Sequence, residues 1–267
     1  MNKIRVFVAG ACGKMGRETV QTILKQEDME IVGVSDIRNQ GSDIGIALGL
    51  SPLGIKISGQ LSKELLQELK ADILVDFTTP QSVFTNAKEA LKAGVVPVIG
   101  TTGLDEQEIT ELKDLANENH VGFFMAPNFA LGAILMMKFA QETAKYFSHV
   151  EIIEYHHDNK LDAPSGTALK TVEMISRVRK PQIQGHPNEY EKVPGARGGD
   201  IDGIHIHAVR LPGLVAHQEV IFGGFGQTLT IRHDAYTRET YMPGVMLAIR
   251  KAYKMTEVVI GLENFLD

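Results

Sequence analysis

Residues 4–16 read IRVFVAGACGKMG, and this stretch decides the predicted fold. Its first six residues form a short apolar run rich in β-branched side chains, which is typical of a buried strand. Gly10, Gly13 and Gly16 follow at intervals of three, and apolar residues at helical spacing continue over Met15 to Lys25. A strand, a glycine turn and a helix in this order predict the first unit of a dinucleotide-binding sheet.

The glycine turn indicates a nucleotide site, although Cys12 stands where the fingerprint G-x-G-x-x-G has its middle glycine. Backbone N–H groups at the start of the helix would bind a pyrophosphate. Asp36 ends the next predicted strand about 20 residues after Gly16, where a carboxylate can accept hydrogen bonds from a ribose. Arg17 and Arg38 could instead meet a 2′-phosphate, so both NADH and NADPH stay open. The alternative is a plain tight turn with a solvated acid.

The rest of the first half continues the same alternation of strands and helices. Short apolar strands without polar alternation are expected where helices cover both faces of a sheet. The pattern therefore predicts an α/β fold with a doubly wound, Rossmann-type parallel sheet. The further strands are expected at Ile31–Ser35, Ile73–Phe77 and Val95–Ile99, with helices at Ser82–Ala93 and Asp105–Asn119.

After Asn128 the pattern changes to that of a second, sheet-rich α+β domain. The segment from Arg179 to Gly203 is polar and rich in Pro and Gly, which predicts an exposed or mobile connection. We expect a dinucleotide-binding domain at 1–129, a second domain at 130–239, and a segment at 240–267 that returns to the first domain. The expected elements are helices Leu131–Phe147, Thr167–Val178 and Gly244–Lys254, strand His149–Tyr155, and short β-type runs within Ile204–Ile231.

Charge and cysteine content limit the partners. The formal net charge of the 267 residues is −6, which argues against binding to nucleic acid or anionic membranes and favours small molecules. The single cysteine, Cys12, cannot form an intramolecular disulfide, and no export signal is evident, so a cytoplasmic protein is predicted. The apolar stretch 121–140 is interrupted by Pro127 and Gly132, and we interpret it as strand, loop and helix rather than a membrane span.

A second candidate site lies in residues 151–170, which read EIIEYHHDNKLDAPSGTALK. His156, His157 and Lys160 fall in a loop after a predicted strand and can supply protons. Ser165 and Thr167 open the next helix, whose N–H groups and hydroxyls suit a carboxylate or a phosphate. The plainer interpretation of the two hydroxyl residues is a simple helix N-cap.

Other polar residues carry weaker signals. His205 and His207 form an H-x-H pair on a predicted strand, but no carboxylate–histidine motif accompanies them, so no metal is predicted. We interpret His217 and His233 as structural or surface residues. Two further basic residues, Arg232 and Arg238, are possible anion contacts or part of a solvated face.

Several segments together resemble one family, 4-hydroxy-tetrahydrodipicolinate reductase, also called dihydrodipicolinate reductase. The string HH-x-x-K…D-A-P-S-G-T-A is highly specific for it, and the similarity spans nearly the whole chain. The segments that carry it are GACGKMG (10–16), DFTTP (76–80), VIGTTGL (98–104), APNFALG (126–132), EYHHDNKLDAPSGTAL (154–169) and RGGDIDGIH (197–205).

The resemblance implies a Rossmann domain that holds NADH or NADPH and a second domain whose open mixed sheet is used for tetramerisation. It implies a cyclic dicarboxylate substrate: 4-hydroxy-tetrahydrodipicolinate is reduced to tetrahydrodipicolinate with loss of water, in diaminopimelate and lysine biosynthesis. A cytoplasmic homotetramer is expected. Ile37 and Thr79 stand where some members have Arg, so no strict preference for NADPH is predicted.

The resemblance also assigns roles to individual residues. His156 matches the family's proton donor or acceptor, and Lys160 matches its proton donor. His157, Gly166 and Thr167 match substrate contacts. The expected cofactor contacts are Gly10, Ala11, Cys12, Gly13, Lys14, Met15, Asp36, Gly100, Thr101, Thr102, Ala126, Pro127, Asn128 and Phe129.

Two other functions remain as alternatives. One is a different NAD(P)-linked oxidoreductase with the same two-domain plan, such as an amino-acid dehydrogenase. The other is a binding protein that senses NAD(H) without chemistry, which the acidic balance and the proton-donor loop disfavour.

Overall fold

The computed structural model describes residues 3–266, and the chain forms two compact units. The first unit consists of Met1–Phe129 and Tyr241–Asp267, and the second of Ala130–Thr240. Each unit builds its own sheet, with seven strands in the first and five in the second.

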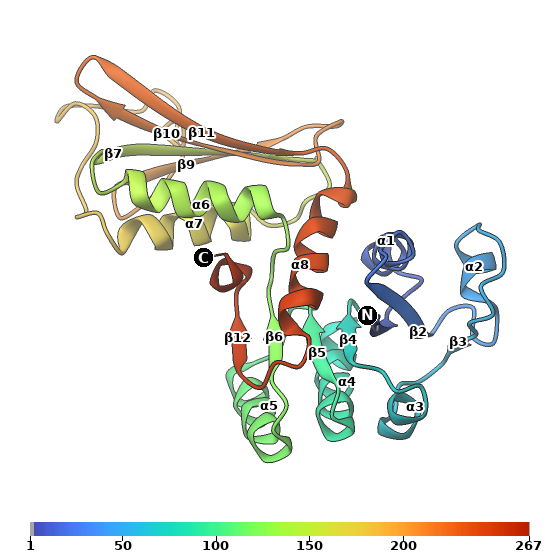
Figure 1. Ribbon diagram of the computed structural model, residues 1–267. Coiled ribbons are helices and arrows are strands. Elements are labelled where there is room, and N and C mark those ends of the chain that lie inside the picture. Colours follow the sequence, from blue (N-terminus) through green and yellow to red (C-terminus); the bar gives the residue numbers. More distant parts are fainter. Residues whose placement is uncertain (1–2, 267) are drawn as a thin grey trace. The chain divides into compact units, whose positions relative to one another are not determined.

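The sheet of the first unit has the strand order β12-β6-β5-β4-β1-β2-β3, and all its pairs are parallel (Figure 1). β1 pairs with β2 on one side and with β4 on the other, so the chain reverses direction across the sheet between these strands. Ligands of such sheets bind at this switch point, beyond the carboxyl ends of the strands. The strands are β1 (Ile4–Ala9), β2 (Met29–Ser35), β3 (Ile57–Ser58), β4 (Ile73–Asp76), β5 (Val96–Ile99), β6 (Phe123–Met125) and β12 (Val258–Ile260).

Helices cover both faces of this sheet. α1 and α8 lie on one face, and α3, α4 and α5 lie on the other (Figure 1). All residues of β4 and β5 are therefore buried, and both strands are continuous apolar runs apart from Asp76 at the end of β4. The helices of this unit are α1 (Lys14–Ile23), α2 (Ile44–Ala47), α3 (Lys63–Glu68), α4 (Pro80–Ala93), α5 (Glu106–Asn119) and α8 (Met242–Ala252), with a 3-10 turn at η2 (Leu262–Phe265). A further 3-10 turn, η1 (Arg238–Tyr241), spans the boundary between the two units.

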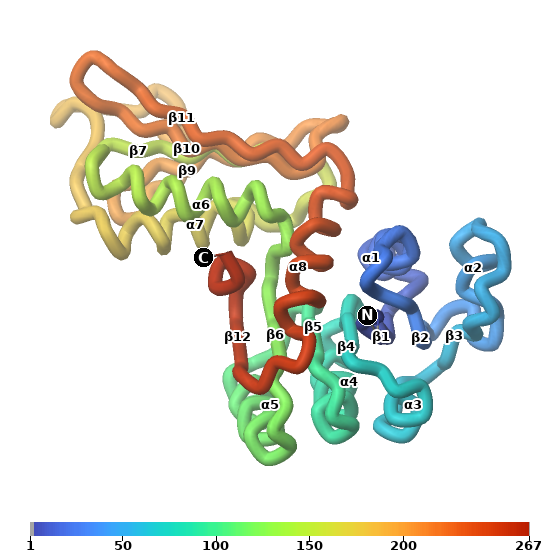
Figure 2. Tube along the Cα trace, in the orientation of Figure 1, coloured from blue at the N-terminus to red at the C-terminus, as the bar shows by residue number. Residues whose placement is uncertain are grey.

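The C-terminal segment completes the first unit. β12 adds to the sheet edge beside β6, although more than 130 residues separate the two strands in the sequence, and the trace in Figure 2 shows them side by side. The Phe265 ring of η2 stacks on Phe124 of β6, with 4.5 Å between ring centroids. This apolar contact holds the end of the chain against the sheet.

The second unit has a mixed five-stranded sheet in the order β11-β10-β7-β9-β8, in which only the β7–β9 pair is parallel. Its two helices lie on the same face of the sheet (Figure 1). Alternate residues of each strand face these helices, as Ile152 and Glu154 do on β7. The elements are α6 (Leu131–Thr143), β7 (His149–His156), α7 (Gly166–Ser176), β8 (Gly199–Ile201), β9 (Ile204–Arg210), β10 (Ala216–Gly224) and β11 (Gln227–Ala235).

The predicted fold class is confirmed, since a doubly wound parallel sheet is joined to an α+β unit with an open mixed sheet. The prediction of an exposed or mobile connection at 179–203 is wrong at Arg179, which is buried, and incomplete at β8, whose residues are exposed but form a paired strand. Arg179 is 5% exposed and donates to the carbonyls of Ser148, Asp202 and Gly203, and β8 pairs with β9. Neither feature follows from Pro and Gly content, because both depend on contacts with distant strands. Within residues 3–266, no helix combines the length and apolar character needed to span a membrane.

Candidate active site

The glycine turn after β1 is shaped for close approach of a ligand. Gly10 has a φ of +77°, which only glycine adopts without steric cost. A β-carbon on Gly16 would lie 2.1 Å from the Gly10 carbonyl oxygen, so no larger residue fits there. Gly13 is the N-cap of α1, and no described side chain caps that helix. Its first backbone N–H groups can therefore bind an anion such as a pyrophosphate.

Asp36 lies at the end of β2 and is tied to the glycine turn. Its Oδ2 accepts from the Cys12 N–H at 2.8 Å, and its Oδ1 accepts from the Arg38 N–H at 2.9 Å and from Arg38 Nε at 3.2 Å. Burial acts to raise the pKa of Asp36, but these hydrogen bonds outweigh it and leave the pKa below its ordinary value. An ionised carboxylate has about four acceptor positions, so Asp36 can still accept from a ribose hydroxyl.

Asp76, at the end of β4, joins two loops at the same edge of the sheet. Its Oδ1 accepts from the Thr78 N–H at 3.0 Å and from the hydroxyls of Thr78 and Thr101, both at 2.7 Å. Its Oδ2 accepts from the Asn86 amide at 2.8 Å. The carboxylate is fully buried, and it fixes the loop after β4 to the loop after β5.

The other predicted cofactor contacts lie along this edge. A β-carbon on Gly100 would lie 2.1 Å from the Phe77 ring, and Thr101 is held by Asp76. Ala126 and Phe129 are buried beyond β6, and the Phe129 ring contacts Phe77 edge-on with 5.8 Å between centroids. The sheet therefore brings together the loops that hold Gly10–Met15, Asp36, Gly100–Thr102 and Ala126–Phe129. These residues fit a dinucleotide: a glycine cradle, free helix N–H groups and an acid for a ribose.

In the second unit, β7 and α7 bring together the predicted proton-donor loop and the predicted anion site. His156 is the last residue of β7, and His157 and Lys160 follow in the loop. Lys160 Nζ bonds Asp162 Oδ1 at 2.7 Å, and its side chain is 20% exposed. His157 is exposed. The strand end and loop therefore present two imidazoles and one ammonium group within five residues.

The loop ends at the N-terminus of α7, where Ser165 is the N-cap. Its hydroxyl accepts from the Ala168 N–H at 3.2 Å, as the plainer interpretation of this residue expected. Gly166 is exposed and begins the helix. A β-carbon there would meet no atom within 4 Å, so the fold itself does not require glycine at this position.

Glu154 links the strand, the loop and the helix. Its side chain is completely buried and accepts from both Arg210 terminal nitrogens, at 2.9 and 2.7 Å. It also accepts from the Ser165 N–H at 3.2 Å and bonds His156 Nδ1. Burial acts to raise the pKa of Glu154, but the hydrogen bonds from Arg210 and His156 outweigh it and lower the pKa. Glu154 is therefore ionised near neutral pH.

The His156 ring is largely neutral in this setting. Burial lowers its pKa, and this effect outweighs the hydrogen bond and charge of Glu154, which act to raise it. The positive charges of Lys160 and Arg210 lower it further.

Most of the remaining histidines and arginines lie outside these clusters, but Arg17 contacts the glycine turn, where its Nε donates to the Cys12 carbonyl at 3.3 Å. His207 Nε2 bonds Glu151 at 2.9 Å, and His217 is 8% exposed and bonds Asp234 at 2.8 Å. Arg232 pairs with Asp234 and Glu219, and Arg17 donates to the Ala47 carbonyl at 2.9 Å. In residues 3–266, no group of three or more His, Cys, Asp or Glu side chains is arranged to hold a metal ion. Among the described residues, the hydrogen bonds of His156, Lys160 and Glu154 do not involve His205, His233 or Arg238.

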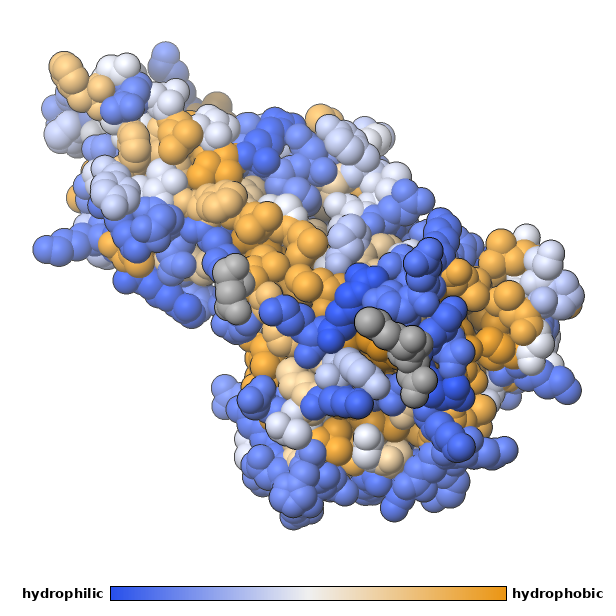
Figure 3. Space-filling model, viewed as in Figure 1, coloured by the Kyte–Doolittle hydropathy of each residue, from blue (hydrophilic) through white to orange (hydrophobic). Residues whose placement is uncertain are grey.

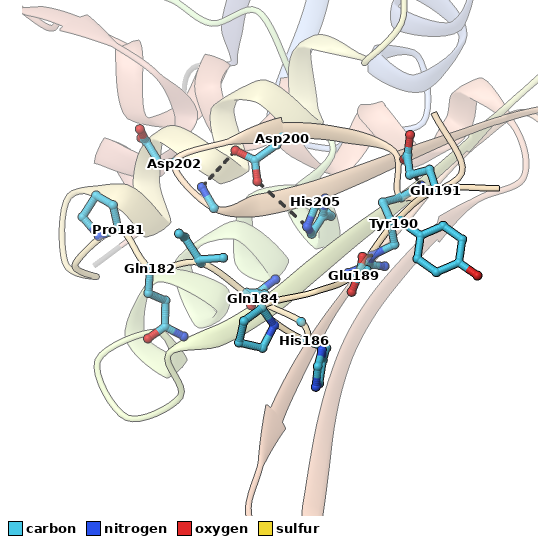
Figure 4. Close-up of a pocket in the computed structure, with 15 residues that line it drawn as sticks. Pro181, Gln182, Gln184, His186, Glu189, Tyr190, Glu191, Asp200, Asp202 and His205 are labelled. Carbon is cyan, nitrogen blue, oxygen red and sulfur yellow. Dashed lines mark hydrogen bonds and ion pairs between the residues drawn. The ribbon is translucent and has the colours of Figure 1, made fainter. Parts of the chain in front are cut away.

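A cavity of about 850 Å³ also lies in the second unit, between the segment 181–191 and the β8–β9 hairpin (Figure 4). Glu189, Tyr190 and Glu191 border it on one side, and Asp200 and His205 on the other. None of the predicted catalytic or substrate residues lines it. It is therefore separate from the site formed by β7 and α7.

Three residues of these sites, Asp76, Glu154 and Arg210, have no role in the expectations drawn from the sequence. Asp76 stands in the DFTTP segment without an assigned contact. The sequence contained a pattern from which a role for Glu154 could have been predicted. Glu154 lies two residues before His156 on a strand, so both side chains point to the same face. An acid on a face that helices cover needs a hydrogen-bond partner. That partner, Arg210, is 56 residues away, and no local pattern connects the two.

A Rossmann-type unit joined to a second unit whose predicted proton-donor loop carries His156, His157 and Lys160 fits the class of nicotinamide-dependent oxidoreductases. Residues 4–129 match the family model described as dihydrodipicolinate reductase, N-terminus, and residues 132–266 match that described as dihydrodipicolinate reductase, C-terminus. The chain belongs to the dihydrodipicolinate reductase family, as the sequence motifs indicated, and the family implies a nicotinamide cofactor.

Individual relatives support the same family assignment. The 4-hydroxy-tetrahydrodipicolinate reductase of Desulfitobacterium hafniense (strain DSM 10664 / DCB-2) is 72% identical, with both chains covered completely. That of Syntrophomonas wolfei is 54% identical over 99% of each chain. A solved structure, dipicolinate-bound dihydrodipicolinate reductase from Paenisporosarcina sp. TG-14, has a TM-score of 0.89 at 48% identity and covers 99% of this chain and 100% of its own. An amine dehydrogenase from Mycobacterium smegmatis, with a TM-score of 0.68 at 15% identity, shares the fold alone.

Proposed function

We propose that the protein reduces 4-hydroxy-tetrahydrodipicolinate to tetrahydrodipicolinate with NADH or NADPH and releases water, as a step of diaminopimelate and lysine biosynthesis. One hydride from the cofactor and one proton enter the substrate, and one water leaves. The observation that carries the proposal is the β7–α7 site, where His156, Lys160 and the start of α7 occur in one loop and helix of a chain that belongs to this family. A solved relative at 48% identity was obtained with dipicolinate, a cyclic dicarboxylate.

The proposed roles follow from the chemistry of each group. A dianionic substrate needs at least two sites that donate hydrogen bonds. Gly166, Thr167 and the first N–H groups of α7 suit one carboxylate, and His157 with the Lys160 ammonium suits the other. His156 and Lys160 handle the proton that accompanies the hydride.

The first unit is proposed to hold the cofactor, whose nicotinamide supplies the hydride. Gly10–Met15 would bind the pyrophosphate and Asp36 a ribose, while Gly100–Thr102 and Ala126–Phe129 would surround the nicotinamide. Supporting this are the start of α1, which no described side chain caps, and the position of Asp36 at the end of β2 beside the glycine turn.

Use of both NADH and NADPH is part of the proposal. Asp36 favours a free 2′-hydroxyl. Arg38 bonds that carboxylate, yet its side chain is 59% exposed, so it can turn toward a 2′-phosphate. Steady-state kcat/KM for both cofactors tests this: a preference below about 1,000-fold, or about 4 kcal/mol, supports dual use, and a larger one contradicts it.

The proposal extends to a homotetramer in the cytoplasm with no nucleic-acid or membrane partner. The net charge of −6 supports the absence of polyanionic partners.

The experiment is to follow oxidation of NADH and NADPH by the purified protein with freshly generated substrate. Turnover that requires this substrate supports the proposal. Turnover only with amino acids or other carbonyl compounds indicates a different dehydrogenase, and cofactor binding without any turnover indicates a sensor.

As a control, His156→Ala should fold normally and lower kcat by ~10² to 10⁴, the usual range for loss of acid–base help. A kcat near that of the wild type would remove His156 from the mechanism. Circular dichroism of the variant checks that the fold is intact.

A further inference from the structure

The buried carboxylate of Glu154 has no part in the roles given above, although it contacts both halves of the β7–α7 site. It lies on the face of β7 that α6 and α7 cover, and its side chain is 0% exposed. A charge in such a place is costly unless it is fully paired.

The pairing of Glu154 is complete. Oε1 accepts from Arg210 at 2.7 Å and from the Ser165 N–H at 3.2 Å. Oε2 accepts from Arg210 at 2.9 Å and bonds His156 Nδ1. Each oxygen thus makes two hydrogen bonds, which is the full capacity of a carboxylate.

This arrangement determines which nitrogen of His156 carries hydrogen. The guanidinium and the amide can only donate, so Glu154 acts as an ionised acceptor, and His156 Nδ1 must donate to it. The neutral ring then carries its lone pair on Nε2. No described residue bonds Nε2, and the ring is 15% exposed, so Nε2 is the nitrogen that can reach a ligand.

The network is poorly suited to a role in stability alone. Arg210 also donates to the Asp162 carbonyl at 2.9 Å, but its Nε–H is buried without a partner. A buried ion pair with an unsatisfied donor is often no more stable than an apolar replacement, so stability alone does not account for this pair.

We propose that Glu154, held by Arg210, is a positioning residue that fixes His156 in the Nδ1–H tautomer and in one orientation, and that ties the ring to the helix start at Ser165. The inference rests on the proposed function. In each turnover Nε2 takes up one proton from the bulk solvent and gives it to the substrate, while the other proton stays on Nδ1 and remains hydrogen-bonded to the ionised Glu154. A single buried carboxylate thereby sets both the proton-transfer group and the amide end of the anion site.

The test is Glu154→Gln. The carboxamide oxygen can still accept from Arg210 Nη2 and the Ser165 N–H, but its NH2 group faces Arg210 Nη1 and His156 Nδ1. One contact to Arg210 is therefore lost, and the ring must adopt the Nε2–H tautomer to accept from the carboxamide. We expect kcat to fall about 100-fold, within the range for lost acid–base help, and KM for substrate and cofactor to change less than about threefold. Two-bond ¹H–¹⁵N correlation spectra, with His156 assigned from the spectrum of His156→Ala, should show the change of tautomer.

Glu151→Gln is the matched control. Glu151 lies on the same strand and also pairs with an arginine and a histidine, Arg197 and His207, but it points to the other face of the sheet. The same substitution there should leave kcat and the His156 tautomer unchanged.

The outcomes distinguish failure of the positioning role of Glu154 from failure of the proposed reductase function. An Nε2–H tautomer in the wild type overturns the proposal whatever the variants do, and so does an E154Q protein with wild-type kcat. If E154Q does not fold, the wild-type spectrum and the variant Arg210→Lys test the proposal instead. Lysine keeps the positive charge but cannot contact both carboxylate oxygens of Glu154 in the same paired way. This variant should therefore lower kcat more than it changes KM. If the wild type turns over no substrate, the proposed function fails while the wild-type spectrum still tests the tautomer.

Discussion

At the scale of single residues, the cofactor site depends on how the charge of Asp36 is balanced. The carboxylate already accepts from Cys12 and from Arg38, and the arginine side chain stands at the surface. A 2′-phosphate would be repelled by Asp36 unless a cation lies between them. If both cofactors are used, as proposed, the arginine should act mainly for NADPH.

We predict that Arg38→Met raises KM for NADPH about tenfold and changes KM for NADH less than about twofold, since tenfold corresponds to about 1.4 kcal/mol. Initial rates at varied cofactor concentration measure both values. An equal rise for the two cofactors would mean that Arg38 holds the loop rather than the phosphate.

A second prediction concerns pH and His156. Burial lowers the pKa of this ring in the folded protein, so the unfolded chain takes up the proton first as the pH falls. The free energy of unfolding is therefore unaffected by the titration of this ring above pH ~6.5, the ordinary pKa of histidine. It decreases as the pH falls from that value toward the lower pKa of His156 in the folded protein.

Urea unfolding of the wild type and of His156→Gln checks the sign. Glutamine does not titrate but can still donate to Glu154. Between about pH 7.5 and about pH 5.5, the wild type should lose more unfolding free energy than the variant. Equal losses would contradict the depressed pKa.

At the scale of elements, two helix starts use glycine for different reasons. Gly16 in α1 has no space for a β-carbon, because the Gly10 carbonyl oxygen would lie 2.1 Å from it. Gly166 at the start of α7 has open space around it and no positive φ. The fold explains the first glycine, and a bound ligand is the simplest reason for the second.

We therefore predict that Gly166→Ala leaves the melting temperature unchanged or raises it slightly, since alanine favours a helix by roughly 0.5–1 kcal/mol over glycine. The KM for substrate should rise about tenfold because the methyl group occupies space at the anion site. Thermal melts and steady-state rates measure the two effects. An unchanged KM would show that no ligand approaches this residue closely.

Gly16→Ala is the contrasting variant. Its β-carbon would press on backbone, which cannot move cheaply, so the expected destabilisation is about 1–3 kcal/mol. Dinucleotide binding should weaken together with stability, whereas in Gly166→Ala the two effects separate.

At the scale of the whole molecule, the sheet of the second unit offers a surface for self-association. α6 and α7 lie on one face, and the other face carries Ile153, Tyr155 and Ile221, all only partly buried. Apolar side chains also gather around the tip of the β10–β11 hairpin, where Phe225 is fully exposed (Figure 3). Soluble homo-oligomers commonly assemble with closed symmetry through such self-complementary surfaces.

We predict that light scattering of the purified protein gives four times the mass of one chain. Ile221→Arg should lower this mass, because it adds a charge to a partly buried position in the centre of the sheet. Tyr146→Arg, at an 80% exposed position after α6, is the control and should leave the mass unchanged. A wild-type monomer would exclude the tetramer.

The sequence by itself determined the doubly wound sheet, the family and the loops of the candidate site. Each of these depends on local patterns: a strand followed by glycines and a helix, an acid at a strand end, and a loop in which His156 and Lys160 stand four residues apart. Short elements without such patterns, α2, β3, α3 and β12, were not foreseen. Their existence depends on neighbours in space, as β12 depends on β6.

Only the tertiary structure decided which buried charges support the site. Asp76 meets Thr101 across 25 residues, and Glu154 meets Arg210 across 56. Such partners are chosen by strand register and helix packing, which a linear pattern does not contain. The physical reason is that a buried carboxylate must be paired, but its partner can come from any strand that the fold places within hydrogen-bond reach.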